Sequence, residues 1–110
     1  MGYDLHIVRG PDFWGNPDHQ VSAEEWHRYI ESDPELTLAP YNGPHFALWS
    51  GASAHAEPWI DWFRGFSVYS KNPDAAIINK MLQIAAHLSA HVRGDDGEIY
   101  TSPTEFYRDD

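Results

Sequence analysis

The chain has 110 residues and no cysteine, and its 17 acidic side chains against 7 lysines and arginines give a formal charge of -10. The lack of cysteine excludes disulfides, thiolate zinc sites and cysteine nucleophiles. The negative charge disfavours bare nucleic acid and anionic lipid, which bind through lysine and arginine, and it favours a basic protein as partner.

A chain of this length can bury one modest hydrophobic core, so we expect a single domain over residues 1–110. Its first element is predicted to be a strand over residues 3–9, where apolar and polar side chains alternate. Residues 10–20 are rich in turn residues and indicate a loop. A helix then begins after Ser22, because residues 22–25 form a capping box, and it ends before Pro34.

Four strands are expected in the middle of the chain. Residues 35–39 predict a short edge strand, and residues 46–49, 59–63 and 66–71 are rich in aromatic or β-branched side chains. Glycine or proline separates these segments from one another. This spacing is typical of antiparallel strands that follow one another along the chain.

A second helix is predicted from a cap at Asn72, with proline in its first turn, to about Ala90. Its apolar stripe comprises Ile77, Ile78, Met81, Ile84, Ala85 and Leu88. Its polar side comprises Asn79, Lys80, Gln83, His87 and His91. Because Gly94–Gly97 lies between two short β-prone segments, the chain is expected to close with a hairpin.

Each helix has one apolar stripe to bury, and the simplest solution is to pack both against the same sheet. We therefore expect an α+β fold, a single antiparallel sheet of about five to seven strands with two helices packed on one face. The opposite face would then carry Asp4, His6, Trp49, Trp59, Asp61 and Tyr69. This composition is typical of the centre of a protein interface, unless the loops at 10–20 or 52–58 cover it as a second small core.

No segment predicts an enzyme, a cofactor or a metal site. His87 and His91 have the spacing of a chelating helix, but the glutamate of a zinc-protease motif is missing, so two exposed histidines are expected. The acidic run 95–98 lacks the EF-hand pattern and is expected to be a polar turn. Glu57 and Asp61 near three tryptophans resemble the carboxylates of a sugar-cleaving site, yet such pairs are frequent in so acidic a chain.

Nearly the whole chain resembles a known group of proteins. The segments that carry the resemblance are Tyr3–Ile7, Ser22–Trp26, Phe46–Trp49, Trp59–Trp62, Lys71–Asp74 and Gly94–Tyr100. Together they resemble small bacterial proteins that look like the immunity proteins encoded beside polymorphic toxins. The resemblance implies a protein that neutralises a toxin domain by tight binding, and it implies no catalytic residue.

No segment matches a signal peptide or a membrane span, so we expect a cytoplasmic protein, a monomer or weak homodimer when free. The leading hypothesis is an acidic immunity protein that binds a basic toxin domain and occludes its active site. Binding is assigned to Trp49, Trp59, Asp61 and Tyr69, and charge steering to Asp95, Asp96 and Glu98. If the first strand lies beside the last hairpin, the acidic segments 1–35 and 91–110 are expected to merge into one patch.

Two alternatives remain open from the sequence. A small-molecule or carbohydrate binder would use the aromatic side chains as a stacking platform, and a deep pocket lined by Trp49, Trp59 and His6 would favour it. In a homodimer joined through the same face, the negative charge would contribute only to solubility.

Overall fold

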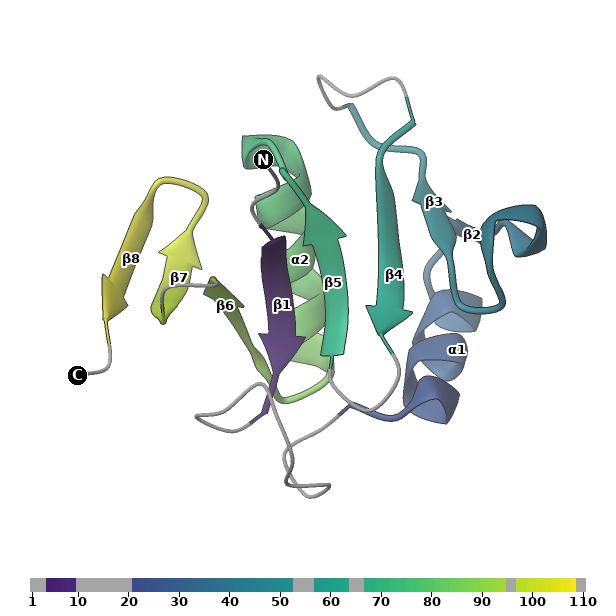
Figure 1. Ribbon diagram of the computed structural model, residues 1–110, viewed down its shortest axis with the longest axis horizontal. Coiled ribbons are helices and arrows are strands. Elements are labelled where there is room, and N and C mark those ends of the chain that lie inside the picture. Colours follow the sequence, from purple (N-terminus) through teal and green to yellow (C-terminus); the bar gives the residue numbers. More distant parts are fainter. Residues whose placement is uncertain (1–3, 10–20, 53–56, 64–66, 95–96, 109–110) are drawn as a thin grey trace.

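A computed structural model describes residues 4–9, 21–52, 57–63, 67–94 and 97–108. Within these ranges it contains eight strands, two α-helices and a 3-10 turn (Figure 1). The helices are α1 (Ala23–Ser32) and α2 (Ala75–His87), and the 3-10 turn η2 spans Pro40–Asn42. The strands are β1 (Asp4–Val8), β2 (Leu36–Leu38), β3 (Ala47–Trp49), β4 (Trp59–Phe63), β5 (Ser67–Lys71), β6 (His91–Gly94), β7 (Glu98–Ser102) and β8 (Glu105–Arg108).

The eight strands form one antiparallel sheet in the order β2-β3-β4-β5-β1-β6-β7-β8. Both helices pack on the same face of it, and Figure 1 shows α2 behind β1 and β5. The predicted α+β fold is therefore confirmed, with slightly more strands than the expected five to seven. The unpredicted strand is β8, which follows a turn at residues 103–104.

The core lies between the sheet and the two helices. In β1 the predicted alternation is confirmed over residues 4–7, since Leu5 and Ile7 are fully buried while Asp4 and His6 are half-buried on the other face; Val8, predicted to lie with Asp4 and His6, is fully buried instead. One contiguous cluster joins the strands to both helices, and its largest fully buried members include Trp26, Leu5, Ile7, Ile60, Ile77, Met81 and Ile84. The predicted apolar stripe of the second helix is wholly buried in this cluster.

The start of α1 follows from its capping box. The Ser22 hydroxyl accepts a hydrogen bond from the backbone N–H of Glu25 at 3.1 Å, and the Glu25 carboxylate accepts one from the backbone N–H of Ser22 at 3.1 Å. The C-cap is Asp33, so the helix ends before Pro34, as predicted.

The start of α2 differs from the prediction, because Asp74 and not Asn72 is the N-cap. The Asp74 carboxylate accepts a hydrogen bond from the backbone N–H of Ile77 at 2.9 Å. Asn72 instead adopts a left-handed conformation, with φ of 48°.

Neither α2 nor any other helix in the described ranges is long and apolar enough to cross a membrane.

The end of α2 also lies earlier than predicted, at His87 rather than Ala90. Ser89 turns the chain with φ of 55°, and the backbone N–H of Ala90 donates to the carbonyl of Ala85 at 2.8 Å. His91 therefore begins β6 and does not lie on a helical face with His87. The helical pair of histidines considered for metal binding does not form.

The last predicted hairpin is confirmed in β6 and β7. Val92 lies opposite Tyr100, and Arg93 lies opposite Ile99. Gly97 has φ of 88°, a conformation that glycine adopts without strain, and this explains a glycine at the end of the turn. Asp95 and Asp96, at the centre of the turn, lie outside the described residues.

The N-cap of α2 can be tested by substitution. Asp74→Ala is expected to lower the free energy of unfolding by about 1 kcal/mol, because it leaves the Ile77 N–H without its acceptor. Asp74→Asn retains a capping oxygen and is expected to stay near the wild-type value. Urea denaturation of the three proteins measures this, and an equal loss in both variants would refute the assignment of the cap.

Candidate binding surface

The helix-free face of the sheet carries a central cluster of side chains. His6 of β1 lies opposite Tyr69 of β5, and Tyr69 lies opposite Asp61 of β4. Trp59 shares the face of Asp61, because side chains alternate along a strand. All four residues are half-buried. Trp59, Asp61 and Tyr69 thus lie on the face predicted for them.

Aromatic contacts make this cluster continuous. Tyr69 stacks on His6 with ring centroids 6.3 Å apart, and it meets Trp59 edge-on at 5.5 Å. Phe46, just before β3, stacks on Trp59 at 5.2 Å. We call the set of Phe46, Trp59, Asp61, Tyr69 and His6 the aromatic face. The sequence analysis missed Phe46 as a member, because its contact depends on how β3 is aligned with β4.

Burial raises the pKa of both Asp61 and Tyr69. For Asp61, a hydrogen bond from the backbone N–H of Trp62 at 2.7 Å and the imidazole of His45 act in the opposite direction. For Tyr69, the negative charges of Asp61 and Asp4 add to the effect of burial on the pKa. The Tyr69 phenol is therefore held in its protonated form beside the Asp61 carboxyl group.

Trp49 does not belong to the aromatic face, so its predicted placement is wrong. It lies opposite the buried Leu36, shares its side of β3 with the fully buried Ala47, and packs against the core on the helix side. Its indole Nε1 donates a hydrogen bond to Glu35 Oε1 at 3.1 Å. The strand itself is predicted correctly, but a short apolar run does not reveal which of its side chains face the core.

Among the residues that the structure describes, the acidic side chains do not form the single patch expected from the sequence. β1 does lie beside β6, which brings Asp4 next to the last hairpin. The acids of α1 and those next to β2 lie elsewhere, because β2 is at the opposite edge of the sheet from β8. Glu98, predicted to steer the partner, is only 5% exposed. Asp95 and Asp96 lie outside the described residues.

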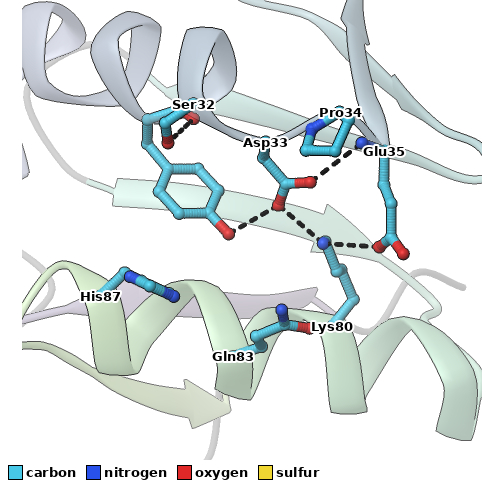
Figure 2. A pocket seen from close by; sticks show the side chains of 8 residues that line it. Ser32, Asp33, Pro34, Glu35, Lys80, Gln83 and His87 are labelled. Atoms are coloured by element: carbon cyan, nitrogen blue, oxygen red, sulfur yellow. Dashed lines mark hydrogen bonds and ion pairs between the residues drawn. The ribbon is translucent and has the colours of Figure 1, made fainter.

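A second polar cluster lies on the helix side, where α1, β2 and α2 meet (Figure 2). The Lys80 Nζ, in a residue only 2% exposed, donates to Asp33 Oδ2 and Glu35 Oε1, both at 2.7 Å. The Tyr29 hydroxyl donates to the same Asp33 Oδ2 at 2.6 Å. We call these four residues the Lys80 cluster. The predicted exposure of Lys80 is thus wrong.

A signal for this burial was present in the sequence. Lys80 follows Ile77 by three positions and precedes Ile84 by four, which are the helical spacings of one face. A lysine on such an apolar stripe requires a carboxylate partner, because an unpaired buried charge is very costly. What the pattern does not show is the identity of that partner.

The contacts of the Lys80 cluster fix its charge states. Burial by itself would lower the pKa of Lys80 and raise that of Asp33, but their mutual hydrogen bond and charge reverse both shifts. The hydrogen bond from Lys80, and then that from Trp49, lowers the pKa of Glu35. Burial, followed by the hydrogen bond to Asp33, raises the pKa of Tyr29. The cluster therefore holds two carboxylates against one ammonium group, with the Tyr29 phenol protonated.

The Lys80 cluster forms one wall of a small cavity. The cavity has a volume of about 260 Å³ and is also lined by Ser32, Pro34, Gln83 and His87. Small-molecule sites are commonly about 300–1,000 Å³ and mostly apolar. The hydrogen bonds of the cluster join side chains of α1, of the segment that leads into β2, and of α2, so the cluster holds these elements together.

Another ion pair joins the end of β1 to α1. Arg9 donates to the two carboxylate oxygens of Glu25 at 3.0 and 2.5 Å, and its Nε donates to the carbonyl of Leu88 at 2.9 Å. The same carboxylate closes the capping box of α1. The hydrogen bonds from Arg9, opposed by burial and aided by those from Ser22, lower the pKa of Glu25 to about 2.

Comparisons of the chain with protein-family models, with curated proteins and with solved structures find no match. In the part of the chain that the structure describes, no three histidine, aspartate or glutamate side chains are arranged to hold a metal ion.

The Lys80 cluster makes a clear prediction about stability. Lys80→Met is expected to lower the free energy of unfolding by about 3–5 kcal/mol, because it leaves the Asp33 carboxylate buried without its cation. Lys71→Met removes the exposed lysine of β5 and is expected to change it by no more than about 0.5 kcal/mol. Chemical denaturation of both variants distinguishes them, and similar losses would contradict the proposed role of Lys80.

Glu25 makes stability depend on acidic pH. Its pKa is about 2 in the folded protein and about 4.3 in an unfolded chain, so the unfolded state binds the proton first as the pH falls. The stabilisation is present above the unfolded value and is lost as the pH falls toward the folded one. We expect Glu25→Gln to be less stable than wild type at pH 7 and similar to it near pH 2. Denaturation midpoints across this range, with Glu31→Gln as the charge-matched control on α1, check the prediction.

Proposed function

We propose that this chain is a binding protein that occludes the active site of a basic toxin domain, as an immunity protein does. The observation that carries the proposal is the aromatic face, where partly exposed rings and a carboxylate gather in a chain of formal charge -10. Aromatic side chains are enriched at the energetic centres of interfaces. Opposite charge accelerates the encounter of two proteins and fixes their orientation.

The members of the aromatic face have complementary roles in this proposal. Trp59 and Tyr69 supply flat apolar surface, on which the guanidinium of an arginine stacks well. Asp61 is a half-buried carboxylate with a raised pKa, and a cation from the partner would offset its loss of hydration. A lysine or arginine of the toxin domain is therefore the group expected to meet Asp61.

The alternative of a small-molecule or carbohydrate site gains no support from the arrangement of the tryptophans. Trp59 and His6 lie on the helix-free face, whereas Trp49 lies on the helix side of the sheet. A deep pocket lined by all three residues therefore does not form. The aromatic face is better suited to a protein surface than to an enclosed ligand.

The proposal is tested with the protein encoded by the neighbouring gene. The two proteins are expected to copurify, and raising the salt concentration is expected to slow their association more than their dissociation. Trp59→Ala is expected to weaken binding by at least about 30-fold, because a central aromatic anchor contributes about 2 kcal/mol or more. Surface plasmon resonance measures both rates.

Tyr41→Ala serves as the control, because Tyr41 is a 77% exposed aromatic residue of η2 outside the aromatic face. Thermal unfolding of each variant separates lost binding from lost folding. Failure to copurify at any salt concentration, or equal binding by the Trp59 and Tyr41 variants, would overturn the proposal.

A further inference from the structure

The two edges of the sheet differ in how well they are protected. β2, at one edge, is three residues long, lies between Pro34 and Pro40, and contacts α1. Short length, proline and a covering helix all hinder the addition of another strand to an edge. β8, at the other edge, contains no proline, and Figure 1 shows it away from both helices.

β8 also exposes aromatic side chains on both faces of the sheet. Phe106 lies opposite Tyr100 and contacts its ring at 5.3 Å, yet it is 49% exposed. Tyr107 lies opposite Ile99 and is 55% exposed. Because adjacent residues point to opposite faces, a partner that packs on one face covers only one of these rings. A strand added beside β8 would place its side chains next to both.

The charge of the chain indicates the chemistry of such a strand. Residues 105–110 contain three carboxylates and one arginine, and the whole chain has a formal charge of -10. A second copy brings the same charge to the edge, whereas an extended segment rich in lysine or arginine complements it. Alternating basic and apolar residues would pair their backbone with β8 and their side chains with Phe106 and Tyr107.

We infer that β8 is a docking edge that pairs, by strand addition, with an extended basic segment of a protein partner. This contact is separate from the aromatic face, and it does not require that the partner be a toxin. Backbone hydrogen bonds to β8 supply general affinity, and the rings of Phe106 and Tyr107 select apolar neighbours.

The test uses the whole protein and a capped hexapeptide of alternating lysine and valine. The peptide is added at about ten times its dissociation constant. Backbone amides that are hydrogen-bonded only in the complex are then expected to exchange with solvent about tenfold more slowly than in the free protein. Nuclear magnetic resonance is expected to locate this protection in residues 105–108. The control peptide has proline in place of each valine. It keeps the same charge but has no backbone N–H at these positions, so it is expected to leave the amide exchange of β8 unchanged.

Variants of the edge complete the test. The double variant Phe106→Thr/Tyr107→Thr keeps residues that favour a strand but removes both aromatic rings. It is expected to weaken peptide binding at least about tenfold. Tyr41→Thr is the control and is expected to bind like wild type.

Three results would overturn the inference. The first is equal binding of the proline peptide, and the second is protection at β2 or the aromatic face instead of β8. The third is a free protein that sediments as a dimer with β8 already protected, which would mean that a second copy occupies the edge. Because no toxin enters these measurements, their failure is distinct from failure of the proposed function.

Discussion

The buried ammonium group of Lys80 is the constraint on which much of the architecture depends. A buried cation is tolerated only when carboxylates surround it, so α2 can dock only where Asp33 and Glu35 meet Lys80. Glu35 in turn accepts the indole N–H of Trp49, which lies on the helix side of β3. One ion cluster therefore couples the position of helix α2 to the side of the sheet that Trp49 of β3 faces.

Local chemistry in the sequence predicts most of the elements but not their long-range pairing. The capping box at Ser22 and the glycine turn at Gly97 depend on near neighbours, and both are confirmed. The side of the sheet that Trp49 faces depends on the pairing of β3 with the neighbouring strand β2. The partner of Lys80, Asp33, lies 47 positions away in the sequence. The cap of α2 was predicted at Asn72, but Asn72 is left-handed and the extended Asp74 caps the helix instead. Of the candidate site, Trp59, Asp61 and Tyr69 are placed as predicted because a regular strand fixes their phase.

The ion pairs also change how the acidity of the chain is distributed. Arg9 and Lys80, two of the seven lysines and arginines, are engaged with Glu25, Asp33 and Glu35. These contacts stabilise the packing of both helices and leave fewer cations to balance the remaining carboxylates. The other 14 carboxylates, against the other five lysines and arginines, account for -9 of the formal charge of -10.

The unequal edges of the sheet have a consequence for assembly. A protein with two open edges can add neighbours at both ends and grow into a fibre, whereas one with a single open edge cannot propagate. Here β2 is short and lies between Pro34 and Pro40, while β8 is exposed. Copies of this chain that pair through β8 therefore stop at a dimer, because each then presents only its short β2 edge, and a filament cannot grow by that route.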